Sequence, residues 1–152
     1  MKYAILGVIL LFATSVHAFT GKVVGVHDGD TITVLTAENV QVKVRLSAID
    51  APEIKQAFGT RSRQSLADMV FGKTVEIPGT SKDRYRRIVS KVILDGVDIN
   101  LAQIKRGMAW HYKQYSKSKA YANAENDARA AHVGLWSDPH AIAPWEFRHP
   151  KK

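Results

Sequence analysis

Apolar and polar residues alternate over residues 40–46, so that every second side chain is apolar. This period of two is typical of a strand buried on one face, and it places Arg45 on the polar face. Residues 19–26 and 31–35 are rich in β-branched side chains and predict two earlier strands, with residues 27–30 forming a tight turn. The three strands are therefore expected to form a meander.

The chain leaves strand 40–46 at a proline. Pro52 has no N–H group to donate and disfavours a helical conformation at Ala51. We therefore expect Asp50 and Glu53 to lie on a stiff, extended exit loop. Two carboxylates would then lie near the guanidinium of Arg45.

The rest of the chain predicts two strands and three helices. The strands are expected at residues 74–77 and 88–94, and the helices at residues 59–71, 100–108 and 119–132. Thr60 and Asn100 are the expected N-caps, and Gly72 is expected to stop the first helix. The last segment, residues 135–152, contains three prolines and three large aromatic side chains, which favours an irregular strap docked by its aromatics.

These elements predict an α+β fold, a small five-stranded barrel with three helices. Such barrels commonly present nucleic acid to one face. With 152 residues the chain has the size of one domain, and it shows no internal repeat.

The N-terminus has the features of a secretory signal peptide over residues 1–18. Lys2 supplies the positive start, an apolar run follows, and residues 16–18 form a cleavage site with small side chains. The alternative is an uncleaved anchor, but the uncharged run is shorter than the roughly 20 residues that span a bilayer. We therefore expect a mature domain of residues 19–152, beginning at Phe19, that is secreted or periplasmic and has no membrane span.

Charge and cysteine content narrow the range of functions. Removing Lys2 from the 22 basic side chains leaves 21 against 14 acidic ones, and the formal charge falls from +8 to +7. A surface of this sign favours polyanions, with nucleic acid as the leading partner and anionic lipid as the second. The absence of cysteine excludes disulfides and thiolate metal sites.

Three polar segments are candidates for chemistry. They are residues 28–31 (Asp-Gly-Asp-Thr), residues 45–53 and residues 83–87 (Asp-Arg-Tyr-Arg-Arg). Taken singly, each is a common turn or loop, and we expect Gly29 to take a positive φ in the first of them. The first segment lacks the acidic ladder of a calcium-binding helix-loop-helix site.

In this order and on this strand pattern, the three segments closely resemble the staphylococcal (micrococcal) nuclease, or thermonuclease, family. The resemblance extends from Val23 to Ser137, with its best matches in the three segments. It implies that family's fold, the oligonucleotide-binding (OB-fold) barrel with three helices. It also implies a calcium-dependent nuclease that hydrolyses DNA and RNA with little sequence preference and leaves a 3′-phosphate.

The resemblance also implies roles for individual residues. Asp30 and Asp50 would be carboxylate ligands of Ca²⁺, and the carbonyl of Ala51 a further ligand. Glu53 would be the general base, and Arg45 and Arg87 would bind the phosphate. These types suit the reaction, because a hard cation and two guanidiniums offset the charge of a phosphodiester.

Some assignments stay open. Oxygen ligands do not by themselves distinguish Ca²⁺ from Mg²⁺, and the choice of calcium follows the resemblance. Arg86 stands beside Arg87 where the family commonly has a small residue. Tyr85 is expected to flank the scissile nucleotide, and either Tyr112 or Tyr115 to stack on a base, with core packing as the alternative role.

Two other functions compete with a monomeric nuclease. The same barrel occurs in noncatalytic modules that bind nucleic acid, in which the acidic metal site is typically degraded. A basic protein can also bind lipid or polyanionic glycans. The presence of all five catalytic-type positions favours the enzyme.

Overall fold

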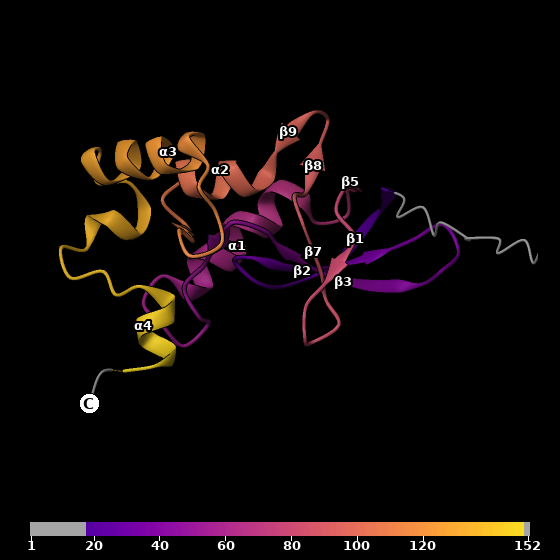
Figure 1. The fold of residues 1–152 in the computed structure, drawn as a ribbon, viewed down its shortest axis with the longest axis horizontal. Helices are drawn as coiled ribbons and strands as arrows, with labels where there is room; N and C mark the ends of the chain where they lie inside the picture. The colour runs from indigo at the N-terminus through magenta and orange to yellow at the C-terminus, as the bar shows by residue number, and fades with distance from the viewer. Residues whose placement is uncertain (1–17, 151–152) are drawn as a thin grey trace, which may run out of the picture.

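The computed structural model describes residues 18–150, and most of its strands belong to one mixed sheet (Figure 1). The strands of this sheet are β1 (Phe19–Asp28), β2 (Thr31–Leu35), β3 (Gln41–Leu46), β5 (Thr74–Ile77), β6 (Ser81–Lys82), β7 (Ile88–Ser90), β8 (Ile93–Leu94) and β9 (Val97–Asp98). A separate two-stranded sheet pairs β4 (Ile49–Asp50) with β10 (Trp110–His111).

The large sheet has the order β6-β7-β3-β2-β1-β5-β8-β9. Strands β1, β2 and β3 form the predicted antiparallel meander, in which Thr31 pairs with both Asp28 and Arg45. Strand β7 runs parallel to β3 and pairs Val89 with Arg45. This register brings the segment before β7 next to the strand that carries Arg45.

Four α-helices accompany the sheet within residues 18–150. They are α1 (Gly59–Val70), α2 (Ile99–Lys105), α3 (Lys119–Ala130) and α4 (Pro144–Arg148), and a short 3-10 helix, η1, covers Gly134–Ser137. Helices α2 and α3 lie side by side, and α4 lies apart from them at the C-terminal end (Figure 1). None of the helices within residues 18–150 has the length and apolar character needed to cross a membrane.

The main core lies between the meander and helices α1 and α2. It consists mainly of β-branched and aliphatic side chains, and those that are fully buried include Val23, Ile32, Val44, Leu46, Leu66 and Ile104. A second cluster joins Trp110, Trp136 and Ala143, with Trp145 packed against it. This second cluster docks the C-terminal segment, as the aromatic content of residues 135–152 predicts, although helix α4 is not part of that prediction.

The predicted five-stranded barrel is correct only in its general class. The fold is α+β, but the large sheet has eight strands and is not closed, since β6 and β9 end it without pairing with each other. The expected strand 88–94 is divided into β7 and β8, which pair with β3 and β5 respectively. A fourth helix, α4, replaces part of the expected irregular strap.

Both predicted N-caps are wrong. Helix α1 is preceded by Phe58 in a left-handed conformation (φ 65°) and has no side-chain cap, so Thr60 lies inside the helix. Helix α2 is capped by Asp98, whose carboxylate accepts from the N–H of Leu101. Asn100 is instead buried, and its side-chain amide donates to the backbone carbonyls of Ser47 and Ser90. Gly72 does end α1, with φ 75°.

The predicted signal peptide falls on residues 1–18, of which 1–17 lie outside the described residues. Strand β1 begins at Phe19, the expected first residue of the mature domain.

Candidate active site

The turn between β1 and β2 places two carboxylates next to each other. Gly29 does not have the positive φ that the turn was expected to require. A glycine is needed there for a different reason: a Cβ would overlap the Ser62 hydroxyl and lie 2.8 Å from the Cβ of Ala51. Gln103 also donates to the carbonyl of Gly29 at 2.8 Å. Helices α1 and α2 therefore fix the position of this turn.

Asp30 points from this turn towards the end of β3 and β4. Its carboxylate is nearly buried and accepts from the Thr31 hydroxyl at 3.1 Å and from the N–H of Ala51 at 2.7 Å. Asp28 lies on the same turn. Burial, followed by the charge of Asp30, raises the pKa of Asp28 to about 7.

Arg45 joins the carboxylates from the end of β3. One nitrogen, Nη1, donates to the carbonyls of Leu46 at 2.6 Å and Ile49 at 2.9 Å. The other, Nη2, lies 3.3 Å from Oδ2 of Asp30 and 3.2 Å from Oδ1 of Asp50. The backbone therefore orients this guanidinium so that one nitrogen reaches both carboxylates.

Asp50 belongs to a strand and not to an exit loop. It lies in β4, where it pairs with Trp110 of β10, and its side chain is 1% exposed. The prediction of an extended loop at this residue is wrong, because β10 supplies a partner strand from a distant part of the chain. Burial raises the pKa of Asp50 even though Arg148 and Arg45 oppose that shift.

Glu53 lies beyond Pro52 and is the most accessible carboxylate of the group, with 37% of its side chain exposed. Its backbone N–H donates to the side-chain oxygen of Gln56 at 3.1 Å. Its Oε1 lies 2.8 Å from Nη1 of Arg148. Glu53 is thus exposed to solvent on the side of the site where a water can reach it.

Arg148 is the residue of this site that the sequence did not predict. It ends helix α4, and it forms a fork on Asp50, with Nη2 2.7 Å from Oδ2 and Nη1 3.2 Å from Oδ1. The aromatic side chains of the tail predicted that this segment docks on the domain. They did not indicate which charged side chain it would bring to the carboxylates.

Arg87 belongs to a neighbouring but separate ion pair. Its Nε and Nη2 each lie 2.8 Å from Oδ2 of Asp83, whose Oδ1 accepts from the N–H groups of Tyr85 and Arg87. Burial acts to raise the pKa of Asp83, but these hydrogen bonds and the charge of Arg87 outweigh it and lower that pKa. The structure therefore orients Arg87 at the segment before β7, without joining it to the carboxylates.

Arg86 adopts a left-handed conformation (φ 64°) and has an exposed side chain. It lies between Tyr85 and Arg87 at the tip of this segment. Its backbone explains why a small residue suits the position, since glycine adopts this conformation without a steric cost.

The three predicted tyrosines differ in exposure. Tyr85 is 63% exposed, with the guanidiniums of Arg84 and Arg87 over its ring at 4.8 and 5.3 Å. Tyr112 stacks on Trp145 (5.4 Å between centroids, 3° between planes), whereas Tyr115 is 70% exposed and meets Tyr112 at its edge. Tyr85 and Tyr115 thus keep the larger free ring surfaces.

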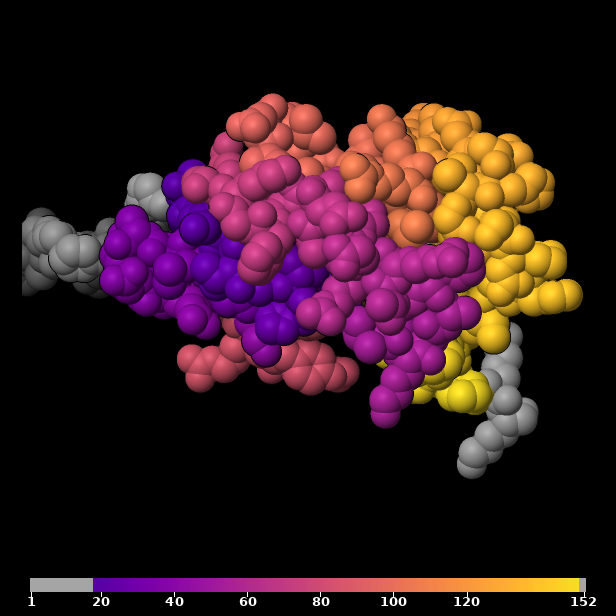
Figure 2. Space-filling view, turned by 180° about the vertical axis from the view of Figure 1, so that it is seen from behind, coloured from indigo at the N-terminus to yellow at the C-terminus, as the bar shows by residue number. Residues whose placement is uncertain are grey.

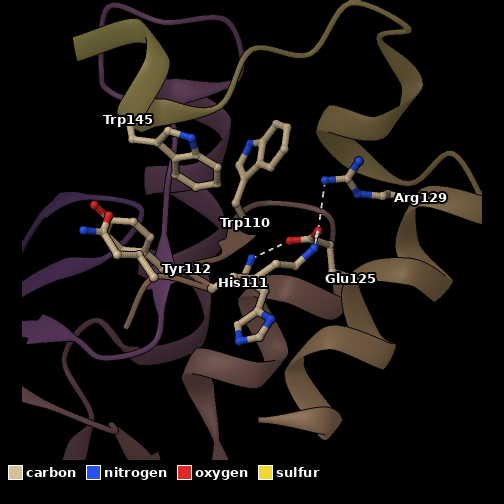
Figure 3. Close-up of a pocket in the computed structure, with 8 residues that line it drawn as sticks. Trp110, His111, Tyr112, Glu125, Arg129 and Trp145 are labelled. Atoms are coloured by element: carbon tan, nitrogen blue, oxygen red, sulfur yellow. Dashed lines mark hydrogen bonds and ion pairs between the residues drawn. The ribbon is translucent and has the colours of Figure 1, made fainter. Parts of the chain in front are cut away.

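A cavity of about 260 Å³ lies beside this aromatic pair (Figure 3). Trp110, Tyr112 and Trp145 line one side of it, and the buried Glu125 lies on the other. Glu125 accepts from the N–H of His111 at 2.6 Å and from Arg129 at 2.9 Å. The hydrogen bond from His111 anchors β10, and through it Asp50, to helix α3.

The donor set restricts the metal that the site can hold. Within residues 18–150 no three or more His, Cys, Asp or Glu side chains form a metal-binding cluster. Asp30 and Asp50 do converge, since both lie within 3.3 Å of Nη2 of Arg45. Two carboxylates with backbone and water oxygens suit a hard cation.

Comparison with known proteins agrees with this geometry. The profile described as "Staphylococcal nuclease homologue" matches residues 43–138. An "Uncharacterized endonuclease" of Haemophilus influenzae is 45% identical over 143 residues, which cover 94% of this chain and 80% of that protein. A "Micrococcal nuclease" of Shigella flexneri is 41% identical over 146 residues, covering 88% and 83%. The chain belongs to the staphylococcal nuclease family.

Proposed function

We propose that this protein is a nuclease that hydrolyses phosphodiester bonds in DNA and RNA with Ca²⁺ as its cofactor. The observation that carries the proposal is the convergence of Asp30, Asp50 and Arg45, with Glu53 beside them at the edge of solvent. The names of its relatives, which include an endonuclease and a micrococcal nuclease, support the same reaction.

The residues present fit a calcium ion. Asp30 and Asp50 would supply two carboxylates, and the N–H of Ala51 donates to Asp30. The carbonyl of Ala51 would be the further protein ligand, as the family resemblance implies. Calcium tolerates irregular sets of oxygen ligands that include water. When bound, such an ion polarises the phosphate and offsets its negative charge.

Arg45 and Arg87 would hold the phosphate. A guanidinium is planar and always charged, so it can grip two phosphate oxygens as charge develops on them. Arg45 is oriented by two backbone carbonyls, and Arg87 by Asp83. Because neither side chain has to find its orientation during the reaction, both are suited to transition-state stabilisation.

Glu53 would act as the general base. A base must be within hydrogen-bond reach of the water that it deprotonates, and Glu53 is the carboxylate of this group with a large exposed fraction. The buried Asp30 and Asp50 are not accessible to bulk water in this way. The expected products carry a 3′-phosphate, as the family resemblance implies.

The rest of the surface would bind the substrate without sequence preference. The formal charge of the mature domain, 21 basic against 14 acidic side chains or +7, attracts the phosphate backbone, and this attraction should weaken steeply as salt rises. Tyr85 and Tyr115 have exposed rings on which bases of any type can stack. We expect the active form to be a monomer, exported from the cytoplasm.

A gel assay of the purified protein on one DNA and one RNA, with calcium or with chelator, tests the proposal. Cleavage of both substrates only with calcium, giving 3′-phosphate ends, is the expected result. Binding without cleavage in calcium would assign the protein to the noncatalytic nucleic-acid-binding modules instead. Binding to anionic vesicles but to neither nucleic acid would assign its charge to a lipid partner.

A further inference from the structure

The C-terminal segment folds back onto the carboxylates of the site. Residues 138–143 connect η1 to α4, and Figure 2 shows this segment, in yellow, against the segment that includes the loop after Pro52. Gln56 of that loop donates to the carbonyl of Ile142. Trp145 stacks on Tyr112, and Ala143 is buried. These contacts hold α4 near the site independently of Arg148.

Both terminal nitrogens of the Arg148 guanidinium donate to the carboxylates of Asp50 and Glu53. All three hydrogen bonds that it makes within residues 18–150 go to Asp50 and Glu53, at 2.7 to 3.2 Å. Together with Arg45 it gives both oxygens of the buried Asp50 a cationic partner. The hydrogen bonds to Asp50, with those to Glu53, raise the pKa of Arg148, so the side chain stays charged.

The two arginines at Asp50 differ in what else holds them. Nη1 of Arg45 is bound to the backbone carbonyls of Leu46 and Ile49, and the side chain is 14% exposed. Arg148 is 35% exposed and donates to carboxylates alone. If another cation takes these carboxylates, Arg148 is the side chain that loses its partners.

A divalent cation at Asp50 would meet Arg148 directly. It would need the same Oδ atoms, and it would lie next to a like charge in a nearly buried site. A cavity of about 150 Å³ lies between the loop after Pro52 and the C-terminal segment, with Ile142 and Phe147 in its lining. The contact between residues 138–147 and this loop therefore includes a hollow and not continuous packing.

We propose that Arg148 is an internal counter-cation of this site, which occupies Asp50 and Glu53 in the metal-free protein and is displaced by Ca²⁺. Displacement frees Glu53 for catalysis and loosens α4. Because coupling between two sites is reciprocal, calcium weakens the docking of α4 as much as docked α4 weakens calcium binding. This inference rests on the metal site of the proposed function.

The test compares calcium affinity in three proteins by isothermal titration calorimetry. They are the wild type, Arg148→Gln and Arg61→Gln. Arg61→Gln is the control, because it removes the same charge from an exposed arginine of α1 whose guanidinium lies over the ring of Phe58. We expect Arg148→Gln to bind calcium at least fivefold more tightly, within the range of about 5- to 150-fold that is typical of coupled sites. Arg61→Gln should stay within twofold of the wild type. Arg148→Lys, which keeps the charge without the fork, should fall between Arg148→Gln and the wild type.

Hydrogen exchange of the wild type supplies a second readout that does not depend on activity. Saturating calcium should speed exchange of the α4 amides, which donate to the carbonyl of Ala143, and leave those of α3 unchanged. Equal or weaker calcium affinity in Arg148→Gln overturns the inference and leaves the proposed nuclease intact. No calcium binding by any of the proteins overturns the proposed cofactor and the inference together.

Discussion

The backbone N–H of Asp30 donates to Oδ1 of Asp28 at 3.0 Å, so two carboxylates share one turn between β1 and β2. Burial of Asp28, followed by the nearby charge of Asp30, raises the pKa of Asp28 to about 7, although the backbone hydrogen bond acts to lower it. The folded protein therefore retains a proton that the unfolded chain loses at its ordinary pKa of 3.8. The contribution of Asp28 to the free energy of unfolding is therefore largest below about pH 3.8, and it is lost as pH rises towards 7.

We expect Asp28→Asn to remove this dependence. In metal-free protein, its free energy of unfolding should exceed that of the wild type at pH 8, and the difference should shrink as pH falls towards 4. Urea unfolding at several pH values in chelator measures this. Asp127→Asn, at an exposed position on α3, is the control and should not alter the slope between pH 4 and 7. A difference that grows towards pH 4 would contradict the shift.

Asp30→Asn and Asp50→Asn should each abolish most of the stabilisation by calcium. A ligand at 100 times its dissociation constant stabilises the folded state by about 2.7 kcal/mol, and only a protein that binds it gains this. Without calcium, Asp50→Asn should cost little stability, because burial disfavours the charged form of Asp50. Thermal melts with and without calcium measure both effects. If calcium stabilised both variants as much as the wild type, Asp30 and Asp50 would not be ligands of the metal.

Glu53→Gln should separate binding from catalysis. Loss of a general base lowers turnover by about 10² to 10⁴. The side-chain amide of this variant would still present an oxygen to Arg148, so nucleic-acid affinity and fold should stay close to the wild type. Single-turnover cleavage and equilibrium binding on one oligonucleotide measure this, with Glu76→Gln, an exposed residue of β5, as the control. Wild-type cleavage by Glu53→Gln in calcium would show that another group activates the water.

Arg87→Ala should lower turnover more than it lowers affinity for the substrate, because its guanidinium would act mainly on charge that develops in the transition state. Arg86→Gly is the neighbouring control and should retain turnover. It should also raise the free energy of unfolding by up to about 1 kcal/mol, since it relieves a left-handed conformation but gives the unfolded chain more freedom. Urea unfolding and single-turnover kinetics measure the pair. A larger loss of turnover in Arg86→Gly than in Arg87→Ala would assign the phosphate contact to Arg86 instead of Arg87.

The exported protein should begin at Phe19. The charged start, apolar run and small residues at positions 16–18 predict cleavage there. Intact-mass measurement of protein collected outside the cytoplasm decides this prediction. Soluble exported protein that retains Met1 would contradict it.

Much of the site could be predicted from local sequence. The alternation over residues 40–46 identified β3 and the position of Arg45, and strands β2 and β5 were predicted with their observed bounds. The period of two identifies β3 because that strand is half-buried. Strand β2 is buried on both faces, and its β-branched residues identify it instead. The cap prediction for α1 failed because its N-cap, Phe58, is in a left-handed conformation and makes no side-chain cap. For α2 two suitable cap residues lie close together, and Asp98, not Asn100, accepts from the N–H of Leu101.

The sequence by itself showed that the segments carrying Asp30, Arg45, Asp50 and Glu53 occur in an order that resembles the family, because turn and strand signals are local and their order along the chain is distinctive. Only the tertiary structure decided how deeply Asp50 is buried and what it touches. Strand β10 pairs with it and Arg148 binds it, although both are far from it along the chain. Contacts of this kind depend on how the aromatic cluster docks residues 138–148 onto the loop after Pro52, and no local pattern specifies that packing.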